Sequence, residues 1–208
     1  PIGLAQERPE SRMGNPFPTK ENLVRRLMDN RHALGRYKWK STTEILKRGK
    51  TISTLVEEVQ PAENETFERT ILSDSSGKIG KKEGEYLDGV IRLARTYLLP
   101  STLGLRGTLA GGVATGRVDE DVGVTGLHIT SYNQSGDSVL FWMDDSTRRA
   151  KRIEVTSRLK KDTVSIFGIF RTLPDGPDIL ASATVKTGKK KWEIRIQNFD
   201  IVLLDEDE

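Results

Sequence analysis

The chain of 208 residues contains 33 basic and 30 acidic residues, carries a net charge of +3 and has no cysteine. Its length allows one β-rich domain with a substantial core, and the lack of cysteine excludes disulfides, thiol catalysis and thiolate-bound metals. Because acidic residues interrupt the basic ones along the predicted strands, the charge pattern argues against a nucleic-acid-binding protein.

The first 18 residues contain four prolines together with glycine and charged residues. Such a stretch cannot bury enough apolar surface to fold alone, so we expect residues 1–18 to form a flexible N-terminal tether. The chain begins at Pro1 and not at methionine. We therefore expect that an N-terminal segment was removed, either as a signal peptide or by trimming.

A first amphipathic helix is predicted over Lys20–Leu34. Thr19 is a suitable N-cap, and Leu23, Leu27 and Leu34 recur at helical spacing on one face. From Tyr37 the apolar period changes to about two, which predicts a β-meander. Its strands are expected over 37–48, 51–60 and 66–72, followed by a polar connector over 73–82.

Helical spacing returns over Glu83–Leu99, and Pro100 ends that predicted helix. The glycine-rich segment 101–123 is expected to be either a short second helix with a loop or a mobile lid. Strand patterns then resume at about Val124, giving about six strands before an acidic tail over 205–208 that we expect to fray.

This element order predicts an α+β fold in a single domain over residues 19–208. It consists of one large curved antiparallel β-sheet, an unclosed half-barrel, with two or three helices on its concave face. Near Asn198 the apolar parity of the last strand switches, which predicts a β-bulge that bends the sheet. No apolar stretch approaches the roughly 18 residues of a membrane span.

No motif in the sequence supports catalytic chemistry or a bound ion. His32 and His128 are the only histidines and have no partner at a metal-ligand spacing. No G-x-S-x-G elbow is present, and Val113 stands where a phosphate-binding loop needs lysine. The acidic segment 119–123 and the pair Asp144-Asp145 are interpreted as turns. We therefore expect no enzyme activity, no catalytic residues, no metal site and no cofactor.

Two stretches resemble a known family. The first is 21–31 running into 34–40, and the second is 136–149 continuing to 152–155. Together they resemble uncharacterised exported bacterial proteins similar to the LolA/LolB-like superfamily of periplasmic lipoprotein carriers. The resemblance implies an unclosed β-barrel whose concave apolar face is lidded by helices and holds acyl chains of lipoproteins or other lipids. Related folds also serve as envelope-stress sensors.

The resemblance predicts a periplasmic or secreted carrier-like protein, with a lipid anchor through the removed N-terminus as one option. Its expected partner is a lipid or an acylated protein. The alternative is a concave face filled by its helices, in an envelope module that binds another protein. Strand parity predicts that an open apolar cavity would be lined by Leu55, Phe67, Ile71, Phe141, Ile153, Val155, Phe167 and Ile169.

Overall fold

The computed structural model describes residues 19–63, 66–110, 112–119, 123–174 and 176–204. Within them lie three helices, which are α1 (Lys20–Leu34), α2 (Lys81–Leu98) and α3 (Thr102–Ala110). The strands are β1 (Tyr37–Lys47), β2 (Lys50–Ala62), β3 (Thr66–Ser76), β4 (Ala114–Val118), β5 (Val124–Thr130), β6 (Ser138–Asp144), β7 (Ala150–Leu159), β8 (Asp162–Thr172), β9 (Asp178–Thr187) and β10 (Trp192–Leu203).

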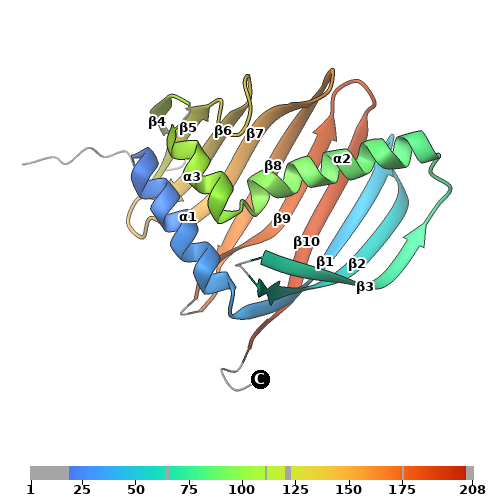
Figure 1. Ribbon diagram of the computed structural model, residues 1–208, viewed down its shortest axis with the longest axis horizontal. Helices are drawn as coiled ribbons and strands as arrows, with labels where there is room; N and C mark the ends of the chain where they lie inside the picture. The colour runs from blue at the N-terminus through green and yellow to red at the C-terminus, as the bar shows by residue number, and fades with distance from the viewer. Residues whose placement is uncertain (1–18, 64–65, 111, 120–122, 175, 205–208) are drawn as a thin grey trace, which may run out of the picture.

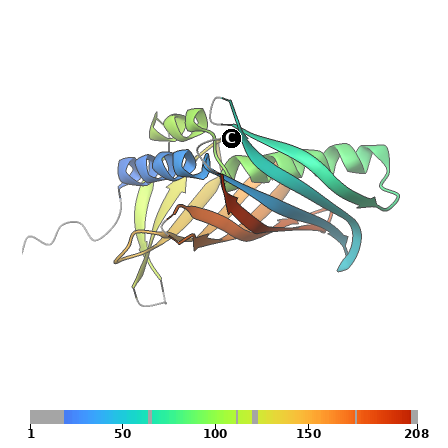
Figure 2. The ribbon, with the colours of Figure 1, turned by 90° about the horizontal axis from the view of Figure 1, so that it is seen from below.

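All ten strands form one antiparallel sheet in the order β3-β2-β1-β10-β9-β8-β7-β6-β5-β4. The sheet curves without closing, because β3 and β4 are its two separate edges (Figure 1). The three helices lie on the same, concave side of it (Figure 2). The predicted α+β half-barrel is thus confirmed.

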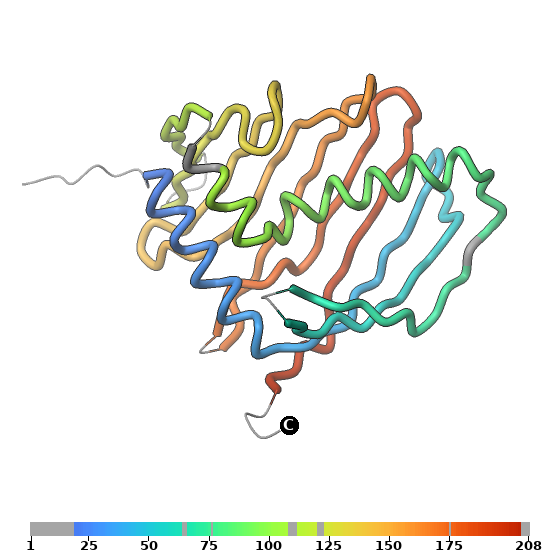
Figure 3. Tube along the Cα trace, viewed as in Figure 1, coloured from blue at the N-terminus to red at the C-terminus, as the bar shows by residue number. Residues whose placement is uncertain are grey.

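The position of the helices follows from the connectivity. After β3 at one edge of the sheet, the chain must reach β4 at the opposite edge. It does so through α2 and α3, and α2 runs obliquely across the strands (Figure 3). Residues Leu87, Val90 and Ala94 of α2 are almost fully buried against the sheet. The segment that connects the two edges of the sheet therefore also covers its concave face.

Several local predictions are confirmed. Thr19 caps α1, its hydroxyl accepting a hydrogen bond of 3.2 Å from the amide of Asn22. The tight hairpin between the first two strands is present one residue earlier than the predicted strand ranges imply, at Arg48 and Gly49, which both have positive φ angles. The bend in β10 is also present, since Lys38 and Lys40 of β1 pair with Val202 and Phe199, leaving an extra residue in β10.

The pair Asp144-Asp145 lies at a turn, as predicted. The Asp144 carboxylate accepts hydrogen bonds from the hydroxyls and amides of Ser146 and Thr147 between β6 and β7. These bonds, led by the one from the Ser146 hydroxyl, hold the pKa of Asp144 well below its usual range. The carboxylate therefore stabilises a hairpin turn.

Two of the predicted boundaries are wrong. The connector expected over 73–82 instead continues β3 to Ser76, because these polar residues pair with β2 through their backbone, and α2 begins at Lys81. In the glycine-rich segment the short helix expected as one alternative is present as α3, but the chain that follows also forms β4, which pairs with β5. The expected tether over 1–18 and the acidic tail over 205–208 lie outside the described residues. None of the described helices has the length and apolarity needed to cross a membrane.

Buried apolar side chains form two clusters on the concave face. The larger one lies beneath α2 and includes Leu98, Phe141 and Ile196. The smaller one joins Leu34 at the end of α1 to Trp39 and neighbouring residues. The region where the two clusters meet contains the candidate site.

Candidate functional site

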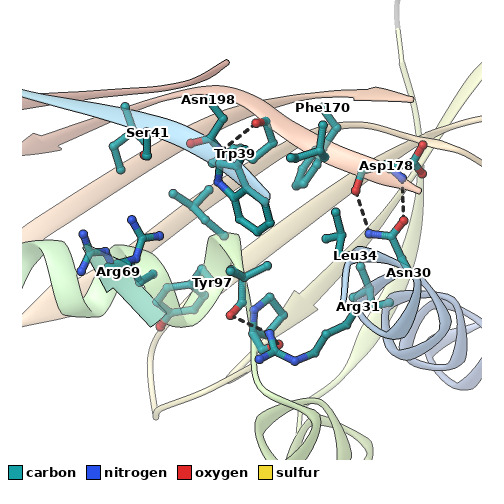
Figure 4. Close-up of a pocket in the computed structure, with 18 of the residues that line it drawn as sticks. Asn30, Arg31, Leu34, Trp39, Ser41, Arg69, Tyr97, Phe170, Asp178 and Asn198 are labelled. Carbon is teal, nitrogen blue, oxygen red and sulfur yellow. Dashed lines mark hydrogen bonds between the residues drawn. The ribbon is translucent and has the colours of Figure 1, made fainter. Parts of the chain in front are cut away.

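A cavity of about 60 Å³ lies between the sheet, α1 and the C-terminal end of α2 (Figure 4). This volume has room for about four water molecules. The lining is mainly apolar and comes from α1, α2 with the two residues that follow it, and six strands. Its apolar residues are Leu27, Leu34, Trp39, Leu98, Leu99, Pro100, Phe141, Phe170, Ile179, Leu180 and Ile196.

One end of the cavity carries a cluster of charges. Arg69 on edge strand β3 and Arg95 on α2 both line the cavity. Their guanidinium groups donate to the same oxygen, Oε2 of the buried Glu57 carboxylate, at 3.0 and 2.9 Å. Two cations thus share one anion. Burial lowers the pKa of Arg69, and the nearby charge of Arg95 lowers it further, while Glu57 acts in the opposite direction.

Trp39 supplies a further donor at this end. The indole ring is only 2% exposed and packs against Phe67 with ring centroids 5.1 Å apart. Its Nε1–H group is buried and has no hydrogen-bond partner among the described residues. An unsatisfied buried donor costs free energy, so this atom marks a place where a ligand acceptor or a water would be favourable.

Helix α1 closes the cavity and is held by a few polar contacts. The Asn30 side chain exchanges two hydrogen bonds with the backbone of Asp178 at the start of β9, at 2.8 and 2.6 Å. The guanidinium of Arg31 donates to the carbonyl of Pro100 at 2.9 Å and lies over the ring of Phe67. Figure 4 shows Asn30 and Arg31 beside the cavity.

Helix α2 is anchored more firmly, by two buried tyrosines. The Tyr97 hydroxyl donates to Asp137 at 2.6 Å and lies 2.9 Å from the hydroxyl of Ser157. The Tyr86 hydroxyl donates to Asp162 at 2.7 Å. Burial, together with the hydrogen bond to Asp162, raises the pKa of Tyr86 to about 12. These bonds fix α2 to the sheet.

The structure brings together only part of the predicted cavity lining. Phe141 lines the cavity. Ile153 and Val155 lie on the same concave face but are buried in the larger cluster. Their side chains serve as core beneath the helices.

Leu55, Phe67 and Ile71 lie on the concave side of β2 and β3, near the edge of the sheet. This follows from their pairing, because Leu55 opposes the inward-facing Thr43, and Ile71 opposes the buried Glu57. Phe67 packs on Trp39. Ile71 is 61% exposed, because β3 is an edge strand. None of the three lines the cavity described above.

Phe167 and Ile169 require a correction, since they lie on the convex face and not on the inner wall. They are 42% and 45% exposed, whereas Val164 and Ile166 of the same strand are buried. Both parities of β8 are apolar, so the sequence pattern alone did not indicate which one faces inward. The position of Gly168 shows which parity faces inward. A Cβ at this residue would lie 2.9 Å from Leu98 of α2, so the even-numbered residues of β8 face the helices.

The arginines of the site were not anticipated from the sequence. A usable signal existed in β2, where Glu57 has the same parity as Leu55 and Val59. A carboxylate on an inward-facing parity needs a cationic partner when it is buried. That partner is the pair Arg69 and Arg95, and identifying it requires knowing that the folded chain brings Arg95 of α2 to the Glu57 side chain of β2.

The described residues include little that resembles a catalytic site. No group of three or more metal-binding side chains occurs there. His128 and Ser138 are 2.8 Å apart on neighbouring strands, but in the described part of the chain no carboxylate is hydrogen-bonded to this imidazole. An orienting acid is needed for a triad-like nucleophile, so this pair gives no support to hydrolase chemistry.

Comparison with known proteins shows similarity in fold. No protein family matches the sequence, and no curated protein matches it. The structure is similar to that of a DUF1329 family protein from Desulfovibrio piger, with a TM-score of 0.54 and 9% identity over 94% of this chain and 95% of that one.

It is also similar to an outer membrane lipoprotein-sorting protein domain from Vibrio parahaemolyticus, with a TM-score of 0.51 and 12% identity over 91% and 95% of the two chains. A LolA superfamily protein from Nitrosomonas europaea gives a TM-score of 0.44 with 11% identity, over 90% and 94%. The fold that the resemblance implied, an unclosed half-barrel with helices on its concave face, is thus shared with the DUF1329 family protein and the lipoprotein-sorting protein domain. At such low identity the similarity concerns architecture alone.

Proposed function

We propose that this protein is a carrier-like binding protein without enzyme activity, which holds an apolar or lipid ligand between its helices and the concave sheet. The observation that supports this most directly is the apolar cavity between α1, α2 and the sheet. A concave, mainly apolar pocket with a few polar groups is the usual form of a small-molecule site. We further propose that it works in the periplasm or outside the cell, on a lipid or an acylated protein.

The size of the cavity bears on how a ligand would enter. A volume of about 60 Å³ is far below the 300–1,000 Å³ of typical ligand pockets. Binding an alkyl chain therefore requires one wall to move outward. Helix α1 is the candidate wall, because its contacts with β9 are the paired hydrogen bonds of Asn30, whereas α2 has two buried tyrosine anchors.

Binding of an uncharged fluorescent probe, N-phenyl-1-naphthylamine, tests the proposal. Its fluorescence should rise with purified protein, and Ser41→Leu should abolish the rise, because Ser41 is buried in the cavity wall and leucine would fill the space. Thr70→Leu, at an exposed position of β3, is the control. Native mass spectrometry of protein purified without detergent, followed by lipid extraction, would identify a natural ligand.

If the probe does not bind, or binds equally to the Ser41→Leu variant with an unchanged circular dichroism spectrum, the cavity is not a ligand site. The alternative function, an envelope protein-interaction or stress-sensor module with a filled core, would then be favoured. It has its own observation, which is the exposure of Phe167 and Ile169 on the convex face. Its test is a partner that stays bound to Ser41→Leu and is lost with Phe167→Ser.

A further inference from the structure

The two ends of the cavity differ in chemistry. The end beneath β3 and β1 carries Arg69, Arg95 and the indole N–H of Trp39. The other end, beneath β6, β8 and β9, is lined mainly by apolar side chains such as Phe141 and Phe170, together with Asn30 and Asp178. A cavity divided in this way matches a ligand with one polar end and one apolar end.

The polar groups at the first end are donors. The indole N–H and the guanidinium groups can donate hydrogen bonds and cannot accept them. Arg69 and Arg95 share the single carboxylate of Glu57, so this group of three has a net charge of +1. The group on a ligand that complements such a wall is an acceptor with a negative charge.

These donors can reach one ligand group. Trp39 is paired with Val59 of β2, which in turn is paired with Arg69 of β3, so the three residues form one row on the concave face. Trp39 and Arg69 are thus two strand spacings apart, about 10 Å between backbones. Arg95 reaches the same place from α2, because it shares Oε2 of Glu57 with Arg69.

The only carboxylate that lines the cavity within the described residues lies at its other side and is already engaged. Asp178 accepts hydrogen bonds from the hydroxyl of Thr172 and the amide of Ala150, and Arg149 lies 3.7 Å away. Its charge is therefore compensated by groups other than Arg69 and Arg95.

We propose that the cavity binds a single-chain amphiphile with an anionic head, either a carboxylate or a phosphate. Its head lies against Arg69, Arg95 and the indole N–H of Trp39, and its alkyl chain lies between α1 and the strands β6, β8 and β9. This proposal rests on the proposed function, to which it adds the class of ligand. The head satisfies the buried indole donor and offsets the excess positive charge of the arginine pair.

The test is calorimetric titration of the full chain with dodecanoate, dodecyl phosphate and dodecanol, which share one alkyl chain. At least one of the anions should bind about tenfold more tightly than dodecanol, a difference of about 1.4 kcal/mol. Comparing the two anions distinguishes a carboxylate head from a phosphate head. Arg69→Gln should remove the preference for the anion and leave the affinity for dodecanol unchanged, whereas Arg69→Lys should keep part of it.

Two further variants separate the proposed contacts from a general loss of structure. Trp39→Phe keeps an aromatic side chain and removes the N–H donor together with part of the ring volume, so it should weaken binding of the anion relative to binding of dodecanol. Arg92→Gln, on an exposed position of α2, should change neither. Equal affinity for dodecanol and both anions, or equal weakening of all by Arg69→Gln, would overturn the anionic head while leaving the carrier proposal intact. If none of the three amphiphiles and no uncharged probe binds, both proposals fail.

Discussion

Replacing Glu57 by glutamine removes the carboxylate that Arg69 and Arg95 share and leaves two guanidinium groups facing each other. Breaking a buried ion pair costs about 3–5 kcal/mol when the remaining charge is isolated from water. Here the side chains of Arg69 and Arg95 are 22% and 35% exposed. Since water can solvate them in part, we expect a loss of about 2 kcal/mol in the free energy of unfolding.

Urea unfolding followed by circular dichroism measures this loss, and thermal unfolding should show a decrease in Tm of about 4–8 °C. Glu58→Gln is the matched control, because Glu58 is the next residue of β2 and pairs with Lys40 on the opposite face. Its effect should stay within about 0.5 kcal/mol. Equal stability of the two variants would refute the view that Glu57 neutralises this wall.

Glu57→Gln should lower the stability of the protein but strengthen its binding of an anionic ligand. Without the Glu57 carboxylate, the net charge of the three groups rises from +1 to +2, so dodecanoate should raise the Tm of Glu57→Gln by more than it raises that of the unmodified protein. Dodecanol should produce no such difference. A smaller dodecanoate shift in the variant would indicate that Glu57 organises the arginines and does not compete with the ligand.

Two more predictions concern the helices. Asn30→Ala removes both hydrogen bonds to the backbone of Asp178 and should lower stability by about 1–2 kcal/mol. Hydrogen exchange should then become faster across α1 and stay unchanged across α2, and uniform acceleration in both would contradict the weaker attachment of α1. The second prediction is a loss of stability at alkaline pH, between about 10 and 12. The pKa of Tyr86 is raised to about 12 in the folded chain, so the unfolded chain loses that proton first and is favoured as the pH rises. The stability curve of Tyr86→Phe should lack this contribution, and identical curves above pH 10 would argue against it.

Much of the architecture could be predicted from local patterns. The apolar spacing of α1 and its Thr19 cap depend only on residues close in sequence, and so does the alternation that identifies the strands. The parity switch in β10 likewise indicated a bend, which lies at Asp200, within two residues of the expected place. These features are visible in the sequence because helix and strand geometry fix which side chains share a face.

The residues of the site could not be predicted in the same way. Arg69 and Arg95 are 26 positions apart, and they meet on Glu57 only because tertiary packing brings α2 and the edge strands β2 and β3 together. In β8 both parities are apolar, so the packing of α2 on Gly168 decided that Phe167 and Ile169 face outward. Local periodicity determined the curved antiparallel sheet and its helices. The cavity, its charged end and its apolar end were decided by tertiary packing, since they depend on which distant elements come to lie against one another.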